Sequence, residues 1–495
     1  MGRPVSLADL AKEVLLTIVE GIRPCDSPAV AAVAAPFAAA LADDRPWTRW
    51  CACIGIDGGA FAMEGLLTGC GFWERLPARS TAPRSRRSCC AAAAVLEKSS
   101  TRSLMLHGGH IGFSLEEVLS DTWRMDVTQD GEHGEQCTWT RIPDLPRSPG
   151  ARTGSDAAVL CGQYFIVHGG VAMPYRRRDS RTYILDLSRE KLEWKQVEGK
   201  RPATRFHHTF TQLGHGKAVA LSCGHNREMD ALGDVHILEC PQTHGGVWSW
   251  VELCSNGGST SSRDEMEARA YHAAAAVGSD RVALFGGLPR RGDFPLNDLW
   301  LLEPASSSQT IMQVKAKGPL PPGRSRHGAI SVGSVFIVFG GSPGVIPWDR
   351  DPLDLWSIDL SGDKDPVWSC LEFSVLQPDV PQWPRHWLLP RLGFHGGHLI
   401  AFGGYRNMQG WDCLGDPVVP ESDEASGDAG GALLILPWHD IFRSKEWRVL
   451  SSQAPKPCAD PVVFMQDFSP PLLLGFEQDE PVPAFQLALE GCIAL

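Results

Sequence analysis

The sequence predicts an all-β fold, a β-propeller of seven blades, preceded by a small α-helical domain. Three observations predict it. An apolar segment ending in two glycines recurs along the chain, and a constant order of four short segments surrounds most copies. The first fifty residues instead have apolar residues at helical spacing. Six blades is the alternative, because the last blade must be assembled from both ends of the chain.

The apolar repeat is represented by VFIVFGG at residues 335–341. Further copies are SLMLHGG (103–109), YFIVHGG (164–170), RVALFGG (281–287) and HLIAFGG (398–404), with a degraded copy, AVALSCG, at 218–224. The glycine pairs recur every 54 to 63 residues. A period of this length is typical of a repeat fold.

Each unit contains four predicted strands, of which the Gly-Gly segment is the second. The first strand opens after an arginine, at 152–160, 205–213, 269–277 and 324–332. The third is expected at 121–127, 181–187, 234–240, 298–304 and 354–360. The fourth carries tryptophan, at 138–142, 193–197, 248–253, 367–373 and 446–450. Four strands per unit is the content of a propeller blade.

The residue types suit blades that stack face to face. Continuous Val, Ile, Leu and Phe runs are typical of strands covered on both faces. Paired glycines allow positive φ and close approach of backbones where the chain turns. The aromatic residues of the third and fourth strands supply bulk for the space between blades.

The remaining segments predict how the ring closes. FWERL at 72–76 has the character of a fourth strand, and three further apolar segments lie within 460–489. If these four strands form one blade, the ring has no open edge. We therefore expect a propeller over 70–495, closed by strand 72–76 with the strands of 460–489, and a linker at 55–69.

The repeat resembles the kelch repeat over residues 70–450. The resemblance rests on the Gly-Gly strand, the Asp-x-Trp of the third strand and the tryptophan strand. The Arg-x-x-His openings at 205–208, 269–272 and 324–327 are similar to the kelch units of plant-type F-box proteins. The resemblance implies a propeller that binds another protein.

Residues 1–54 predict three short helices. Ser6 and Asp9 form a capping box, and the second and third helices are expected to begin near Pro28 and Pro36. The apolar faces are formed by Leu7, Leu10, Val14, Leu15 and Ile18, then by Val30, Val33, Phe37 and Leu41. So short a domain buries little area by itself and is expected to need a partner.

This layout is similar to an F-box. LAKEVLLTIV (10–19) stands at the family's first helix, with Ala11 in place of its proline, and RPWTRWC (45–51) at its terminal tryptophan segment. The resemblance implies docking on a Skp-type adaptor, which connects to a cullin and a RING ubiquitin ligase. The contact residues it implies are Leu10, Leu15, Ile18, Val33 and Trp47. A helical cap that packs on the propeller itself is the alternative.

Composition excludes several classes of protein. A net charge of −12 opposes a nucleic-acid role, because phosphate binding needs a basic surface. No apolar run approaches the roughly 18 residues that a membrane-spanning helix needs. Fifteen cysteines without a secretory leader predict reduced thiols, and hence a cytoplasmic or nuclear location.

No catalytic, cofactor or metal motif is recognised. The sequence lacks a Gly-rich phosphate loop, a nucleophile elbow and a His-Glu-x-x-His helix. The recurrence of His168, His207, His208, His272 and His327 at equivalent places predicts a packing role. We therefore expect a protein that is not an enzyme, and keep an unrecognised propeller enzyme as the third possibility.

Arginines predict the substrate site. One stands at the start of each first strand, and we expect the six to gather at one mouth of the central channel: Arg87, Arg152, Arg205, Arg269, Arg324 and Arg385. Such a ring would bind a protein substrate through an acidic or phosphorylated motif. The alternative is pairing with the aspartates that begin the third strands, Asp121, Asp234, Asp298 and Asp354.

Together these features predict the substrate-recognition subunit of a Skp/cullin/F-box-type ubiquitin ligase. The first alternative is a kelch scaffold for protein interactions with no ubiquitin role.

Overall fold

The computed structural model of the 495-residue chain describes part of the sequence. The described residues are 72–75, 78–84, 90–96, 101–111, 117–130, 134–173, 177–214, 216–241, 246–254, 266–290, 294–304, 310–343, 354–362, 365–372, 390–395, 398–402, 410–411, 417–418, 433–437, 448–450, 463–465, 472–474 and 484–488. Every regular element in these residues is a strand, so none of them is a helix that could cross a membrane. The predicted helical domain (1–54) and linker (55–69) lie outside them.

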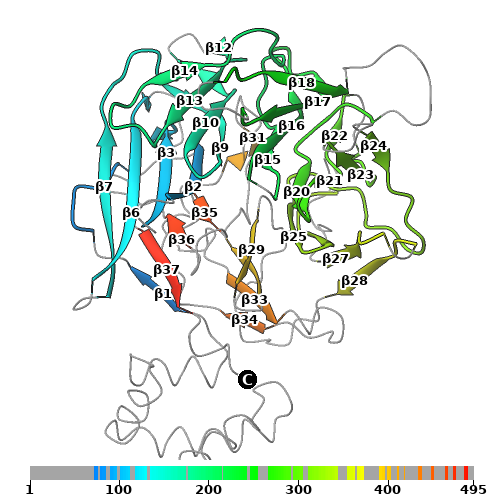
Figure 1. Cartoon of the computed structure of the whole chain (residues 1–495). Helices are drawn as coiled ribbons and strands as arrows, with labels where there is room; N and C mark the ends of the chain where they lie inside the picture. The colour runs from blue at the N-terminus through cyan, green and yellow to red at the C-terminus, as the bar shows by residue number, and fades with distance from the viewer. Residues whose placement is uncertain are drawn as a thin grey trace, which may run out of the picture.

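Antiparallel sheets of four strands follow one another along the chain (Figure 1). The first contains β2 (Cys90–Leu96), β3 (Thr101–His107), β6 (Thr122–Asp130) and β7 (Gly134–Ile142). The second contains β9 (Asp156–Leu160), β10 (Tyr164–His168), β13 (Thr182–Asp186) and β14 (Trp194–Gln196). The third is built on β15 (Thr209–Gln212), β16 (Ala218–His225), β17 (Ala231–Glu239) and β18 (Trp250–Cys254).

The next three sheets repeat the same strand order. The fourth contains β20 (Ala273–Val277), β21 (Arg281–Phe285), β23 (Leu299–Glu303) and β24 (Thr310–Gln313). The fifth contains β25 (Gly328–Val332), β26 (Val335–Phe339), β27 (Asp354–Asp359) and β28 (Trp368–Glu372). The sixth contains β29 (Arg391–His395), β30 (His398–Phe402), β33 (Leu433–Pro437) and β34 (Arg448–Leu450).

One further sheet joins the two ends of the chain. It contains β35 (Val463–Met465), β36 (Leu472–Leu474), β37 (Ala484–Ala488) and β1 (Phe72–Arg75). β1 pairs antiparallel with β37, with Phe72 opposite Ala488 and Arg75 opposite Phe485. A strand from near the start of the chain therefore completes a sheet formed by its last strands.

The first strands of the sheets surround a common axis. Each contacts the first strand of the next sheet: β2 contacts β9, then β9 contacts β15, β15 contacts β20, β20 contacts β25, β25 contacts β29, and β29 contacts β35. β35 in turn contacts β2. The contacts thus form a closed circle, and the sheets radiate from it as propeller blades do (Figure 1).

The core lies between adjacent sheets and explains the uninterrupted apolar runs of the second strands. In β10, Phe165 and Val167 pack with Met105 of the preceding sheet, whereas Ile166 packs with Val219 of the following sheet. Successive side chains of a strand point to opposite faces, and both faces are covered here. Burial of each such side chain contributes roughly 1.5–3 kcal/mol.

Tryptophans fill the space between sheets, as their positions predict. Trp194 and Trp368 are almost completely buried, and each lies in a cluster that spans two neighbouring sheets. β24 has no tryptophan, which is why the sequence did not reveal this fourth strand. Its place is taken by Ile311, which packs against the cluster shared with the third sheet.

The Gly-Gly pairs lie where one sheet meets the next. Gly286 has φ +66°, and a Cβ atom there would lie 2.6 Å from the carbonyl oxygen of Arg324 in the fifth sheet's opening segment. The following Gly287 N–H donates to that same oxygen at 2.9 Å. The first glycine is therefore required by positive φ and by close approach of the next repeat.

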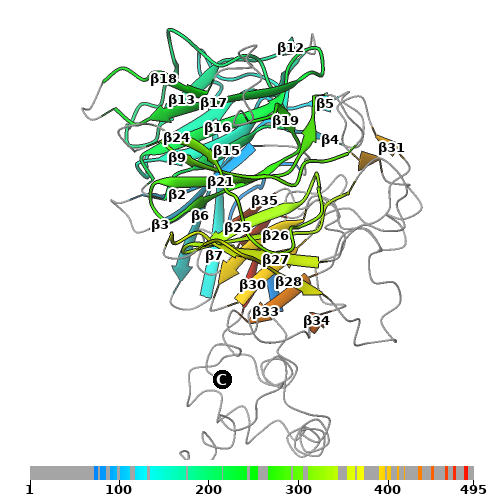
Figure 2. The same ribbon diagram turned by 90° about the vertical axis from the view of Figure 1, so that its right-hand side faces the viewer.

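Short additional strands gather on one face of the ring. We name the mouth face the side where second strands end and third strands begin. It carries β4 (His110–Ile111), β5 (Glu117–Val118), β8 (Arg152–Thr153), β11 (Val171–Ala172), β12 (Arg177–Arg178), β19 (Arg269–Ala270), β22 (Leu288–Pro289), β31 (Gly410–Trp411) and β32 (Pro417–Val418). Figure 2 shows β4, β5, β12 and β31 toward the same side of the ring.

Candidate partner-binding face

Four of the six predicted arginines belong to the described part of the chain. Arg152, Arg205, Arg269 and Arg324 precede the first strands of their sheets, and each side chain is fully buried. Arg87 and Arg385 lie outside the described residues.

The buried guanidinium groups are paired within their own repeats. Arg205 binds Asp234 through two bonds, Nη1 to Oδ1 at 2.9 Å and Nη2 to Oδ2 at 2.6 Å. Its Nη1 also donates to the carbonyl oxygen of Cys223 at 2.9 Å. Arg205, which precedes the first strand β15, is thus bonded both to the third strand and to the end of the second strand.

The fourth and fifth sheets repeat this arrangement. Arg269 binds both carboxylate oxygens of Asp298 at 2.6 and 2.7 Å, and its Nη1 donates to the Gly286 carbonyl at 3.1 Å. Arg324 binds Asp354 at 2.8 and 3.1 Å. Bidentate pairs of this kind have fixed geometry, which suits a role in holding the blade together.

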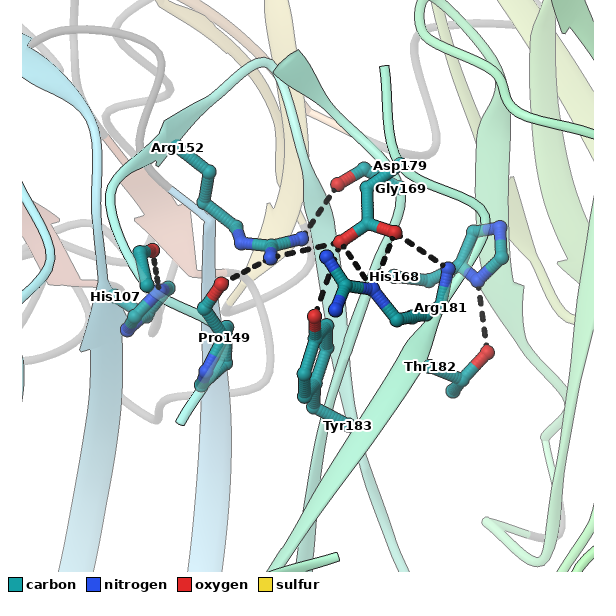
Figure 3. A network of polar contacts seen from close by, with 10 residues as sticks. His107, Pro149, Arg152, His168, Gly169, Asp179, Arg181, Thr182 and Tyr183 are labelled. Carbon is teal, nitrogen blue, oxygen red and sulfur yellow. Dashed lines mark hydrogen bonds and ion pairs between the residues drawn. The ribbon is translucent and has the colours of Figure 1, made fainter. Parts of the chain in front are cut away.

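The second sheet uses a different aspartate. Arg152 Nη2 donates to Asp179 at 3.0 Å, and Nη1 donates to the Gly169 carbonyl at 2.9 Å. Asp179 also accepts from Arg181 Nε at 2.8 Å and from the Tyr183 hydroxyl at 3.0 Å. Figure 3 shows Arg152, Arg181 and Tyr183 all directed at this one carboxylate.

The prediction of an arginine ring open to a ligand is wrong for these four residues. Their guanidinium groups point into the blades, where a carboxylate and backbone carbonyls already accept from them. The alternative, pairing with aspartates, is found for Asp234, Asp298 and Asp354. Desolvation is the physical reason, because a fully buried cation needs a nearby anion and hydrogen-bond acceptors.

Pairing keeps Asp234 and Asp298 ionised. Burial alone would raise the pKa of Asp234, but hydrogen bonds from His236 and Arg205 outweigh burial and lower this pKa to about 2. The pKa of Asp298 is lowered in the same way, burial being outweighed by Arg269. These two pairs therefore remain charged throughout the neutral and mildly acidic range.

The residue two places after each arginine interrupts the strand. It has positive φ in every one of these repeats: Gly154, His207, Tyr271 and Arg326. This turn separates the arginine from the inner strand, which contradicts the single first strands predicted to begin at the arginines. Non-glycine residues in this conformation are strained, and such residues cluster at functional sites.

Three of these side chains form a stack along the mouth face. The rings of His207 and Tyr271 lie 4.2 Å apart with an interplanar angle of 28°, and the Arg326 guanidinium carbon lies 3.6 Å from the Tyr271 ring centroid. Backbone bonds follow the same path, from Tyr271 N–H to the His207 carbonyl and from Arg326 N–H to the Tyr271 carbonyl. The stack therefore links the third, fourth and fifth repeats.

Four of the five repeated histidines, His168, His208, His272 and His327, are buried packing residues, as the sequence predicts, whereas His207 belongs to the stack. His208 lies against Gly169 and His168 of the preceding repeat, and His272 Nε2 lies 2.9 Å from Thr209 Oγ1 of the preceding repeat. Burial, together with the charge of Arg205, lowers the pKa of His208 to about 3. Such histidines are neutral at physiological pH.

Arg181 is the side chain of the mouth-face network that reaches solvent. It is 46% exposed, while its partner Asp179 is 6% exposed. Its Nε is used by Asp179, whereas its Nη groups make no hydrogen bond with other described residues. It belongs to the arginine-rich loop 171–181, which also contains the strand β12.

The family model described as the KLHDC2/KLHL20/DRC7 Kelch-repeats domain matches residues 155–404, half of the chain. The chain belongs to the kelch-repeat family. Kelch domains of this family are typically scaffolds that bind proteins. The buried arginine-aspartate pairs and the Gly-Gly joints described above are thus the framework of a kelch domain, on which the mouth-face loops are carried.

Curated relatives share the kelch region at modest identity. An F-box/kelch-repeat protein of Arabidopsis thaliana is 28% identical over 49% of this chain and 49% of its own length. Host cell factor of Drosophila melanogaster is 28% identical over 37% of this chain and 12% of its own length. Adagio-like protein 3 of Oryza sativa subsp. japonica is 27% identical over 61% of this chain and 44% of its own length. The chain therefore spans half or less of these relatives.

Two features of the kelch mouth face were missed by sequence reasoning. Asp179 lies three residues before its strand, whereas β6, β23 and β27 begin at or next to their aspartates and Asp234 lies inside β17. The arginine-rich sequence around Asp179 was the feature of the sequence that could have indicated this aspartate as an ion-pair partner. The stack of His207, Tyr271 and Arg326 could have been noticed from the shared spacing after each arginine.

No group of three or more His, Cys, Asp or Glu side chains in the described residues could hold a metal ion.

Proposed function

We propose that this chain is the substrate-recognition subunit of a Skp/cullin/F-box-type ubiquitin ligase in the cytoplasm or nucleus. The observation that carries the proposal is the match to an F-box/kelch-repeat relative, in a chain whose residues 1–54 have the helical spacing of an F-box. In this arrangement the kelch domain binds the protein substrate and the amino-terminal segment binds a Skp-type adaptor.

The kelch domain is proposed to be one ring of seven blades. The closed circle of contacts from β2 to β35 supports this count, as does the pairing of β1 with β37. Closure by strands from both ends of the chain restrains the ring from opening, which provides a rigid platform for the mouth-face loops.

We place the substrate site on the mouth face, around loop 171–181 and the His207, Tyr271 and Arg326 stack. The four buried arginines support this surface from below and do not contact the substrate. Arg181 is the exposed cation of the site, so the substrate class is a protein segment with an acidic or phosphorylated motif.

An anionic peptide is expected to bind about tenfold more weakly after Arg181→Ala, because a charge-assisted hydrogen bond contributes roughly 1.5–3 kcal/mol. Fluorescence anisotropy with a labelled phosphoserine peptide measures this. Arg189→Ala is the matched control: Arg189 is 43% exposed and paired with an aspartate in the same sheet, but it follows β13 and lies on the opposite face. Equal effects of the two variants, or no effect of Arg181→Ala, would move the site elsewhere.

A kelch scaffold without a ubiquitin role is the second candidate. The relatives support it because Host cell factor matches the kelch region and has no F-box in its name. The two functions differ in what residues 1–54 bind, so one experiment separates them.

The full chain is expected to co-purify with a Skp-type adaptor and a cullin, whereas a Leu10→Asp, Ile18→Asp double variant should lose both. The charged side chains would disrupt the apolar helical face on which the adaptor docks. The measurement is affinity capture followed by immunoblotting, with circular dichroism showing that both proteins fold. A folded wild-type chain that captures neither partner would establish the scaffold function instead.

A further inference from the structure

Two cysteines meet on the face opposite the mouth, at the joint between the second and third sheets. Cys161 lies in the turn between β9 and β10, and Cys240 directly follows β17. Both are unpaired thiols that are partly exposed to solvent. Neither contributes to the proposed partner-binding face.

The backbone holds the two residues against one turn. Cys161 N–H donates to the Gly216 carbonyl at 2.8 Å, and Cys240 N–H donates to the carbonyl of the next residue, Lys217, at 2.7 Å. The side chains are also close enough to interact, because the Cys161 thiol is among the groups that raise the pKa of Cys240. A disulfide forms when side-chain rotation brings the two sulfur atoms to the bonding distance of about 2.05 Å.

Cys161 occupies a backbone position that disfavours a side chain. Its φ is +53°, and Gly162 after it has φ +65°, the signs found in a two-residue type I′ turn. The fourth and fifth sheets have Gly278 and Gly333 at the equivalent position, with φ +64° and +61°. A cysteine is therefore kept where the fold favours glycine, because a side chain at positive φ is strained.

The joint between the fourth and fifth sheets shows the same backbone geometry without the sulfur atoms. There Gly278 N–H donates to the Gly333 carbonyl at 3.3 Å, and Leu360 N–H donates to the Ser334 carbonyl at 2.9 Å. Gly278 thus corresponds to Cys161, and Leu360 to Cys240. The fold brings these two positions together, and the sequence places thiols at both of them in the second and third sheets.

We propose that Cys161 and Cys240 are an oxidation site, which a peroxide converts to a disulfide that joins the second and third blades. The site is distinct from the mouth face and independent of any ubiquitin role.

The chemistry requires one peroxide for the pair. The Cys161 thiolate attacks a peroxide oxygen, the O–O bond breaks, and Cys161 becomes a sulfenic acid while water leaves. Cys240 sulfur then attacks Cys161 sulfur, the S–O bond breaks, and a second water leaves. Two thiols are oxidised by two electrons and hydrogen peroxide is reduced to two waters. Cys240 acts in the second step, because burial and the neighbouring thiol raise its pKa to about 12 and so disfavour its thiolate.

Mass spectrometry tests the proposal on the full chain. The protein is treated with hydrogen peroxide, alkylated with N-ethylmaleimide and digested without reductant. We expect a cross-linked peptide pair containing Cys161 and Cys240 that dithiothreitol separates. The exposed Cys370 and the buried Cys223 are internal comparators. Recovery of Cys161 and Cys240 on separate peptides, alkylated or oxidised to sulfinic acid, would overturn the proposal.

Cys161→Gly is the variant of choice, because glycine suits the positive φ and the protein should fold at least as well as the wild type. It should lose the cross-link. The unfolding temperature of the oxidised wild type should exceed that of the reduced protein by several degrees, whereas oxidation should not change that of the variant. An equal shift in both proteins would show that another pair of cysteines is responsible.

The equivalent joint supplies a second test. A Gly278→Cys, Leu360→Cys variant should form a disulfide under the same conditions, because the two backbone hydrogen bonds of the joint are shared. A Cβ atom at Gly278 would lie more than 4 Å from every described atom other than those of its chain neighbours, so it causes no clash, and the bond needs the longer part of the usual Cβ–Cβ range of about 3.5–4.5 Å. A folded variant that does not form this disulfide would show that the backbone arrangement is insufficient for oxidation.

Discussion

Replacing Arg205 with methionine is expected to lower the free energy of unfolding by about 3–5 kcal/mol. The substitution leaves the Asp234 carboxylate, which is 5% exposed, without its guanidinium partner. It also removes the donor to the Cys223 carbonyl, an atom at the end of the second strand. Since a domain's whole stability is about 5–15 kcal/mol, loss of this one pair is a large effect.

Urea denaturation followed by tryptophan fluorescence measures this loss, and two variants calibrate it. Arg181→Ala breaks an ion pair whose arginine is exposed and should cost less than about 1 kcal/mol. An Arg205→Met, Asp234→Leu double variant removes both charges and should cost less than the two single variants together.

Unchanged stability together with a loss of peptide binding would instead indicate that the arginines bind the ligand. If Arg205→Met unfolded at the same urea concentration as the wild type but no longer bound an anionic peptide, the guanidinium would serve binding. In that case the buried pair would have to open when the partner docks.

The repeat architecture was predictable because each copy adds independent support for the same strand order. The glycine pairs could be located from the sequence, since positive φ and close approach of the next repeat leave glycine the suitable residue at Gly286. Strand β24 was not located, because Thr310–Gln313 has neither tryptophan nor alternation strong enough to separate it from a loop.

The burial of the arginines could not be read from spacing alone. A residue such as Arg269 is equally compatible with a channel ring and with a buried ion pair until the direction of its side chain is known. The positive φ at Tyr271, two residues later, determines that direction by separating the arginine from the inner strand. Nothing in the one-dimensional pattern specifies this turn, because tyrosine does not signal positive φ as glycine does.

The cysteine pair shows a similar limit. Cys161 and Cys240 are 79 residues apart in the sequence, and the spacing carries no metal or disulfide signature. Their proximity depends on how the second sheet packs on the third, which is a property of the ring. Comparison of repeats within the structure reveals it, because equivalent joints can be superposed position by position.

Acidification is expected to unfold the protein near pH 5, because four described histidines are buried in their neutral form. Burial is the main cause, and it lowers the pKa of His208 and His327 to about 3 and that of His168 and His272 well below the ordinary value. Unfolding exposes them, and their pKa returns to about 6.5. Below pH 6.5 the unfolded chain therefore binds more protons than the folded one, and stability falls.

The size of this effect follows from proton linkage. Each histidine contributes a slope of about 1.4 kcal/mol per pH unit once the unfolded form is protonated, so four give a loss of about 8 kcal/mol between pH 7.5 and 5.

Asp156 acts in the opposite direction. Burial raises its pKa to about 6, so the folded state gains a proton in this range, which offsets roughly 1–2 kcal/mol. The paired aspartates do not contribute, because the pKa of Asp234 is lowered to about 2 and its stabilisation is lost only below about pH 4.

Urea denaturation at pH 7.5, 6.5 and 5.5 tests the prediction, and two substitutions change its slope in opposite directions. His208→Phe keeps an aromatic ring at a site where neither ring nitrogen has a hydrogen-bond partner, and it should make the slope shallower by about one quarter. Asp156→Asn should make the slope steeper, because the opposing carboxyl is removed.

A free energy of unfolding that stays constant from pH 7.5 to 5.5 would mean that these histidines become protonated inside the folded ring. The joints between blades would then have to admit water at acidic pH, since a desolvated imidazolium beside Arg205 would otherwise be unstable.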